Sequence, residues 1–213
     1  MKTNIVFAIT LFFISSCSTL AFWSDDSEEE TSEPVKLTKI QNQYPIDIEW
    51  RRSFDGANDL GSFVPSFYSG EMIFADPKGN LLSINPNNGK TNWDMNLKRD
   101  LSAGTASGFG KIIVSDTNGF VIAIDSVTKE TLWEKNIGGE VLSNGVISAS
   151  LVLLKNSVGE LVALDSATGE QKWSFRSQLP ALTVRGTGEP IIENGTVFST
   201  FDNGRMGAFQ LDT

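Results

Sequence analysis

The sequence predicts an all-β fold, a β-propeller whose blades are four-stranded antiparallel sheets of about 40 residues each. One repeat motif occurs three times and runs from a glycine, through an apolar stretch and an Asn or Asp, to a tryptophan. Glycine and tryptophan are 14 residues apart in every copy, and successive tryptophans are 40 residues apart. The copies run from Gly79 to Trp93, from Gly119 to Trp133, and from Gly159 to Trp173.

Each position of the repeat motif has an expected structural role. The leading glycine permits a positive φ that other residues avoid. The side chains of Asn85, Asp125 and Asp165 are expected to bond their own backbone two residues on and so to start a turn. The second copy departs from the motif at Lys129, where the other copies have glycine. Regular spacing favours packing of the tryptophans between blades, and a stacking surface for a ligand is the alternative.

The third copy shows the expected strands most clearly. Residues Val146–Leu154 are rich in strand formers, and Glu160–Leu164 forms a second candidate strand. A turn is expected at Ser166–Gly169, followed by a third strand over Glu170–Phe175. Alternation with period two and frequent turn signals support these assignments.

The first and last repeats are incomplete. Trp50 lies 43 residues before Trp93 and is predicted to end an opening repeat. A fourth motif begins at Gly204–Phe209, with Gln210 at the Asn/Asp position, and its tryptophan is due near position 218. The chain is therefore expected to be a fragment, roughly the first half of a longer propeller, because a cut blade leaves an open strand edge. A natural half-propeller that dimerises is the alternative.

Residues 1–16 have the features of a secretory signal. Lys2 precedes an apolar run over Ile5–Ile14, which is too short to span a bilayer. A buried apolar strand or helix is the alternative. The four residues that end at Cys17 resemble a bacterial lipobox, which implies cleavage before the cysteine and its acylation. Ser18, in place of an aspartate, favours the outer membrane.

The acidic residues are concentrated after the signal. The net charge is -9, and residues 24–34 contain six Asp and Glu and no basic residue. Such a run is typical of a solvated tether. We therefore predict a lipidated acidic tether over residues 17–40 and a partial propeller over 41–213. No basic patch is available to neutralise phosphates, so no nucleic-acid partner is expected.

The repeat motif resembles that of pyrroloquinoline-quinone-type β-propellers, which include both dehydrogenases and non-enzymatic binding proteins. A narrower resemblance lies in Leu179–Pro190, which stretches the glycine-to-glycine interval from 40 to 45 residues. This segment resembles that of the BamB family, the lipoproteins of the outer-membrane β-barrel assembly machinery. Asp202–Arg205, Gln41–Tyr44 and Trp50 match the same family, and the resemblance covers essentially the whole chain.

The resemblance implies an eight-bladed propeller on the periplasmic face of the bacterial outer membrane. It implies a non-catalytic scaffold that binds the periplasmic domains of the barrel-forming subunit BamA and assists barrel folding and insertion. Its contact positions match Leu182, Val184 and Arg185. Arginine flanked by apolar residues is a common interface anchor. The alternatives are ordinary strand residues at these positions and a different envelope partner. Edge strands are a further candidate contact, for unfolded outer-membrane protein precursors.

The composition argues against the enzyme alternative, a quinoprotein dehydrogenase. The sequence contains no histidine and only one cysteine. Histidine is the commonest general base and metal ligand. Asp125 and Asp165 recur at one repeat position, which favours a turn role over catalysis. No catalytic residue, cofactor or metal is expected.

The lipobox assignment predicts the behaviour of Cys17→Ser in the full chain. Without the thiol, no acyl chain attaches, so labelled palmitate should not be incorporated and the chain should leave the membrane fraction. Metabolic labelling and fractionation measure both effects, with Ser18→Ala as the control that keeps them. Palmitate on the Cys17→Ser chain would contradict the assignment.

Overall fold

A computed structural model describes residues 36–38, 47–53, 61–182 and 188–212. The chain divides into two units, Met1–Ile46 and Asp47–Thr213, and every described strand belongs to the second. The predicted signal, Cys17 and most of the predicted tether lie outside the described residues. Among the residues described, no helix is long and apolar enough to cross a membrane.

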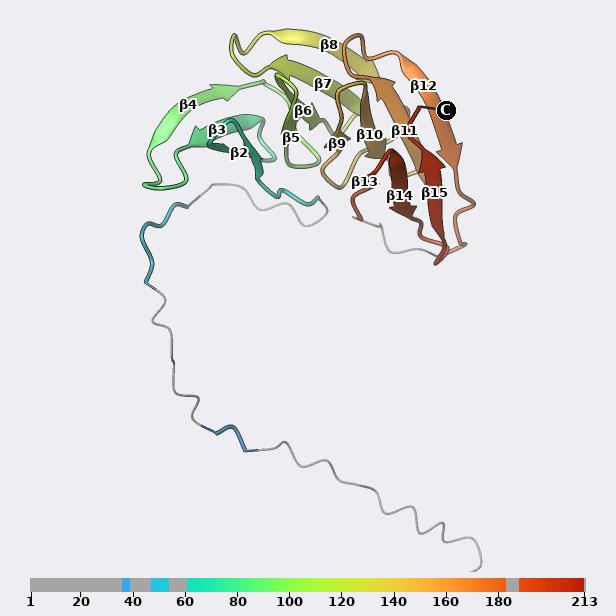
Figure 1. Cartoon of the computed structure of the whole chain (residues 1–213), viewed down its shortest axis with the longest axis horizontal. Helices are drawn as coiled ribbons and strands as arrows, with labels where there is room; N and C mark the ends of the chain where they lie inside the picture. Colours follow the sequence, from blue (N-terminus) through green and yellow to red (C-terminus); the bar gives the residue numbers. More distant parts are fainter. Residues whose placement is uncertain (1–35, 39–46, 54–60, 183–187, 213) are drawn as a thin grey trace, which may run out of the picture. The chain divides into compact units, whose positions relative to one another are not determined.

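The second unit consists of successive antiparallel sheets, each a meander in chain order (Figure 1). Blade 1 comprises β1 (Ser66–Tyr68), β2 (Glu71–Ala75), β3 (Asn80–Ile84) and β4 (Thr91–Asn96). Blade 2 comprises β5 (Ala106–Gly108), β6 (Lys111–Ser115), β7 (Phe120–Asp125) and β8 (Thr131–Asn136). Blade 3 comprises β9 (Val146–Ile147), β10 (Leu151–Lys155), β11 (Glu160–Asp165) and β12 (Gln171–Arg176). The predicted all-β propeller fold is confirmed.

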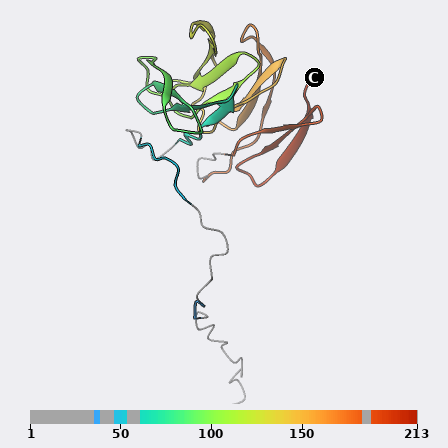
Figure 2. The same ribbon diagram turned by 60° about the vertical axis from the view of Figure 1, so that its left-hand side comes forward.

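Blade 4 has three described strands, β13 (Ile191–Glu193), β14 (Thr196–Thr200) and β15 (Met206–Gln210). Figure 2, a view turned by 60°, shows this sheet next to the other blades. In blades 1 to 3 the third strand pairs with a fourth, whereas β15 pairs only with β14 among the described strands. The strand-rich stretch Val146–Leu154 contains two strands, β9 and β10, and Ser148 bonds Leu151 and turns the chain between them.

The hydrophobic core is divided among the junctions between successive blades. Ile112 and Val114 of β6 pack toward blade 1, whereas Ile113 packs toward blade 3. In the same way, Val152 faces blade 2 and Leu151 faces blade 4. A middle blade therefore buries both faces of its central strands, which explains why β10 is buried at every position. The long apolar run in each repeat follows from this double burial.

The tryptophan that ends one blade docks on the β3–β4-type turn of the next. Trp133 donates its indole N–H to the Ser166 carbonyl at 3.0 Å, and its ring covers Gly169. A Cβ at Gly169 would lie 2.6 Å from the ring, so the contact requires glycine. Trp50 repeats this contact on blade 1, with 2.7 Å to the Pro86 carbonyl, and Trp173 bonds the Leu211 carbonyl of blade 4.

The junction of blades 1 and 2 uses a different set of contacts. Lys129 occupies the glycine position with a φ of 65° and places its ammonium 4.2 Å from the centroid of the Trp93 ring. The Lys129 ammonium also donates to the Ser126 carbonyl, the acceptor that the tryptophan N–H takes elsewhere. Trp93 instead donates to the carboxylate of Glu71 at 2.9 Å. A cation–π contact thus replaces the close ring-to-glycine contact.

A single amide joins the first three blades where their inner strands begin. The side chain of Asn144 precedes β9 and donates to the carbonyl of Val64, ahead of β1, at 2.8 Å. It also donates to the carbonyl of Thr105, ahead of β5, at 3.0 Å. Asn144 therefore holds the starts of β1, β5 and β9 close together. This is the end of the sheets at which the links between blades lie.

The tryptophan junction predicts unequal costs for two glycine substitutions. Gly169→Ala introduces a left-handed alanine and a clash with Trp133, and should lower the free energy of unfolding by about 2–4 kcal/mol. Gly110→Ala is the matched control, because Gly110 has a similar φ of 78° but no atom within 4 Å of the added Cβ. It should cost only about 1–2 kcal/mol. Urea unfolding of the full chains measures both, and equal costs would refute the steric role of Trp133.

Candidate functional site

The link from blade 3 to blade 4 is longer than the other links. The links after β4 and β8 each contain nine residues, 97–105 and 137–145, whereas the link after β12 contains fourteen, 177–190. The five extra residues match the excess in the sequence interval. Residues 183–187, and with them Val184 and Arg185, lie outside the described residues. Leu182, the last residue before that gap, is 94% exposed.

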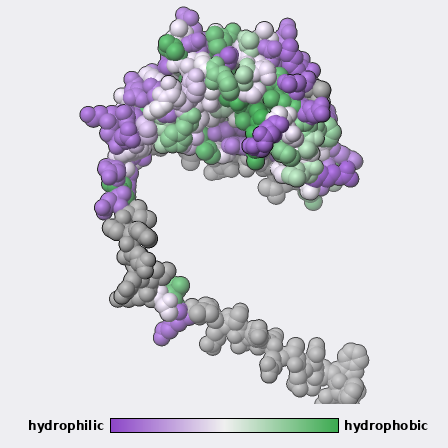
Figure 3. All heavy atoms as spheres, viewed as in Figure 1, coloured by the Kyte–Doolittle hydropathy of each residue, from purple (hydrophilic) through white to green (hydrophobic). Residues whose placement is uncertain are grey.

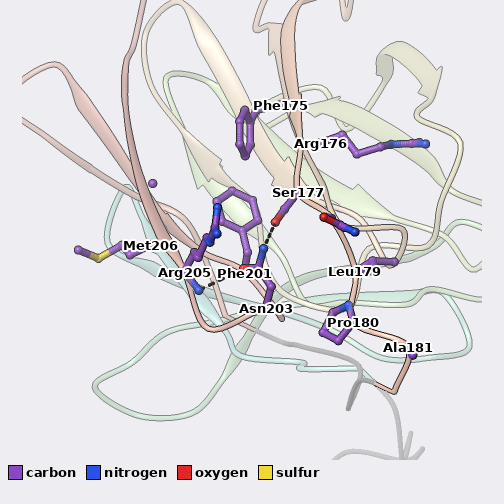
Figure 4. A pocket seen from close by; sticks show the side chains of 12 residues that line it. Phe175, Arg176, Ser177, Leu179, Pro180, Ala181, Phe201, Asn203, Arg205 and Met206 are labelled. Carbon is purple, nitrogen blue, oxygen red and sulfur yellow. Dashed lines mark hydrogen bonds between the residues drawn. The ribbon is translucent and has the colours of Figure 1, made fainter.

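The first part of this link is anchored to both neighbouring blades. Ser177 donates its backbone N–H to the Gly159 carbonyl at 2.9 Å, the same bond that starts the other two links. Its hydroxyl accepts a hydrogen bond from the Asn203 amide of blade 4 at 2.8 Å (Figure 4). Leu179 then lies over Gly159, where a Cβ would approach it to 2.8 Å. The chain is therefore held as far as Leu179 before it reaches Leu182.

The last part of the link is anchored as well. A Cβ on Gly188 would lie 2.9 Å from the Thr200 hydroxyl, so a side chain at this position would push that hydroxyl aside. The carboxylate of Glu189 accepts a hydrogen bond from the backbone N–H of Asn144, which ties it to blade 3. Pro190 is buried and leads into β13. The described residues on both sides of 183–187 are thus held to the blades.

A buried lysine lies beneath the second anchor. Lys155 is 6% exposed and donates from its ammonium to the Thr200 carbonyl at 3.1 Å. Burial lowers the pKa of Lys155 below its ordinary value, and the charge of Asp202 opposes that shift. Burial raises the pKa of Glu189 above its ordinary value, and the hydrogen bond from Asn144 opposes it. The ammonium of Lys155 is therefore poorly solvated.

A groove of about 660 Å³ runs beside the first anchor, between β12 and blade 4. Its apolar wall contains Phe175 and Phe201, whose ring centroids are 5.3 Å apart, and Phe175 is 42% exposed. Arg176 and Arg205 add positive charge (Figure 4). In Figure 3 hydrophobic residues are exposed on this right-hand part of the molecule among hydrophilic ones. The groove and the exposed Leu182 form one continuous candidate contact region, here called the blade 3–4 region.

The repeated residues occupy structural positions. The glycines that open the motif all have φ near +80° and precede the third strands; they are Gly79, Gly119 and Gly159. Asp125 and Asp165 accept backbone N–H groups two residues on, at 2.8 and 2.9 Å. Hydrogen bonds from Thr128 and Val127 lower the pKa of Asp125, and the Lys172 side chain followed by backbone N–H groups lowers that of Asp165. Both carboxylates are therefore occupied in turns.

The described residues contain no group of three His, Cys, Asp or Glu side chains that could hold a metal ion. The chemistry that the blade 3–4 region offers is recognition, through apolar area and arginine donors. The groove was not predicted from the sequence, although one signal was present. Phe201 stands three residues before Gly204, where the other blades have Asp76, Asp116 and Asn156. Those polar side chains cap their turns, whereas Phe201 fills the groove wall.

Comparison with known proteins gives a consistent family. A family model described as outer membrane protein assembly factor BamB matches residues 55–213. The outer membrane protein assembly factor BamB of Kangiella koreensis is 44% identical over 189 residues, which cover 88% of this chain and 49% of that protein. The chain thus spans about half the length of this curated relative.

Solved structures give the same fold. The crystal structure of BamB from Moraxella catarrhalis aligns with a TM-score of 0.65 and 22% identity, over 73% of this chain and 47% of that one. A quinohemoprotein alcohol dehydrogenase from Pseudomonas putida aligns with a TM-score of 0.58 and 16% identity, over 75% of this chain and 34% of that one. At these identities the likeness concerns the fold alone.

The buried lysine predicts a pH dependence of stability. The folded chain releases the Lys155 proton at a lower pH than the unfolded chain, whose ordinary pKa is 10.5. Between those values the unfolded state binds more protons, so the free energy of unfolding should rise with pH. Lys155→Met should remove that rise.

Urea unfolding of the full chain between neutral pH and pH 10 measures this effect. Lys135→Met is the control, because it removes an exposed lysine from β8. An unchanged pH dependence in Lys155→Met, or an equal change in the control, would contradict the assigned burial effect.

Proposed function

The chain belongs to the BamB family of outer membrane protein assembly factors, and from that premise we propose that it is a lipid-anchored, non-catalytic scaffold that binds BamA. In this proposal it assists the folding and insertion of β-barrel outer-membrane proteins. The family membership supports a role in outer-membrane protein assembly. Binding to BamA, the lipid anchor and the periplasmic orientation are proposed in addition to that role.

The observation that carries the proposal is the anchored link of blade 3 to blade 4. An exposed leucine on an unsupported loop loses conformational entropy when a partner binds it. Here the described ends of the link are held at Ser177 and at Glu189, which lowers that entropy cost. Leu182 is presented almost fully exposed at the edge of this interval. Such an arrangement favours a hot spot, in which few residues carry most of the binding energy.

The proposed anchor fits the distribution of charge. Acylation of Cys17 would hold the chain on the outer membrane, and the acidic residues in 24–34 would keep the following segment in solution near an anionic surface. The segment from Cys17 to the described residues at position 47 contains about 30 residues, enough for the propeller to reach a partner some distance from the bilayer.

The proposal predicts the effect of two substitutions on binding to the periplasmic domains of BamA. Leu182→Asp and Arg185→Glu should each weaken capture of those domains by the full chain about tenfold or more, the effect of losing a hot-spot residue. Co-purification followed by titration measures the loss.

Val127→Asp is the matched control. Val127 is 83% exposed, but it lies on the β7–β8 turn, at the opposite end of its blade from the links. Thermal unfolding should be unchanged in all three variants. Leu182 and Val127 are exposed, and exposed positions contribute little to stability. Wild-type capture by both Leu182→Asp and Arg185→Glu would exclude the blade 3–4 region as the BamA contact.

A further inference from the structure

The turn that joins β5 to β6 has an unusual residue at its tip. Gly108 pairs with Lys111, so Phe109 and Gly110 form a two-residue hairpin loop. Phe109 has a φ of 50° and Gly110 a φ of 78°, and a type I′ turn requires positive values at both positions. That turn favours Asn, Asp or glycine, and a bulky side chain at positive φ is a steric outlier.

The equivalent turns of blades 1 and 4 have small polar residues in place of the phenylalanine. They are Ser69–Gly70 and Asn194–Gly195, with φ of 53° and 49° at the first position. Phe109 gains little burial in exchange for its strained backbone, because it is 56% exposed. Backbone strain that the packing does not repay is typical of residues that take part in function.

A second exposed apolar residue lies beside this turn. Val127, on the β7–β8 turn, is 83% exposed. The backbone N–H of Ser126 donates to the Gly110 carbonyl at 2.9 Å, which joins the two turns. Because Gly110 and Ser126 are the chain neighbours of Phe109 and Val127, both apolar residues lie at the end of blade 2 opposite the links. Phe109 and Val127 are here called the blade 2 tips.

Two ammonium groups lie beside the blade 2 tips. Lys111 donates to the Phe109 carbonyl at 3.4 Å, and Lys129 donates to the Ser126 carbonyl. The carboxylate of Asp125 is bound by backbone N–H groups of its own turn. Projecting apolar residues with ammonium groups beside them are typical of a surface that enters the interfacial layer of a bilayer with anionic lipids.

We propose that the blade 2 tips insert into the interfacial layer of a phospholipid membrane, with Phe109 as the main anchor. The proposal rests on the lipid anchor proposed above for Cys17. A chain that is already held at the membrane makes its second contact at a high effective concentration, so two apolar side chains suffice. A bilayer interface has no fixed shape and receives projecting side chains without a matching pocket. This contact turns the links, and with them the blade 3–4 region, away from the bilayer.

Photocrosslinking on vesicles tests the contact. The full chain is coupled through Cys17, its one cysteine, to vesicles of phosphatidylethanolamine and phosphatidylglycerol that carry a maleimide lipid. The photoreactive residue p-benzoylphenylalanine replaces Phe109 in one variant and Leu182 in the control. Leu182 is 94% exposed and lies on a link, at the other end of the blades. Under ultraviolet light, lipid should attach to position 109 at least about tenfold more than to position 182, as measured by mass spectrometry.

Two outcomes of this experiment would overturn the proposal. One is equal attachment of lipid at the two positions. The other, with the same variants in cells, is a protein adduct at position 109 in place of a lipid adduct. Because the maleimide lipid takes the place of acylation on the vesicles, a chain that is not acylated in cells still gives a valid result there. Failure of the Cys17 anchor and failure of the blade 2 contact are therefore distinguishable.

Phe109→Asn separates a lipid contact from a structural role. Asparagine is the residue of the equivalent turn in blade 4, so the midpoint of thermal unfolding of the full chain should rise by about 2–5 °C. Lipid attachment to p-benzoylphenylalanine at position 127 should nevertheless fall at least about threefold, because the main anchor is lost. A lower midpoint, or unchanged attachment at position 127, would overturn the proposal.

Discussion

The contact on which the rest of the structure depends is the tryptophan of one blade against the turn of the next. Its ring takes the space that a side chain on the turn would need, and its N–H binds a carbonyl that the turn leaves free. This fixes the distance from blade to blade, so the sheets bury their faces against each other. The same contact recurs at Trp50 on the turn of blade 1.

The blade 3–4 region follows from that constraint. When successive blades are held at a constant spacing, nine residues suffice to connect them, as in links 97–105 and 137–145. The link after β12 has five more residues, and both of its described ends stay attached to the blades. Ser177 and Glu189 supply those attachments. The blades on both sides of the longer link keep their packed junction.

Much of the fold could be predicted from the sequence, because the same pattern of glycine, Asn or Asp, and tryptophan occurs in three copies with constant spacing. The glycines, the Asn/Asp turns and the longer interval after Trp173 were all visible as spacing. The groove depends instead on which residues from two blades come together, and a single repeat carries only half of that information. Phe201 and Phe175 meet across the junction, and Lys155 becomes buried only because blade 4 covers it. Val184, Arg185 and Cys17 stay predictions, because they lie outside the described residues.

The different contacts of Trp93 at the junction of blades 1 and 2 affect the order in which blades can pack during folding. Identical repeats can associate in the wrong order, and misassembly is a characteristic failure of repeat proteins. At this junction Trp93 needs a lysine on the facing turn, whereas Trp50 and Trp133 need the absence of any side chain there. Blade 2 therefore cannot take the place of blade 1 against Trp50 without Lys129 clashing with the ring that there covers Gly89. Lys129, in place of the glycine of the other turns, therefore makes the junction of blades 1 and 2 specific for its own two blades.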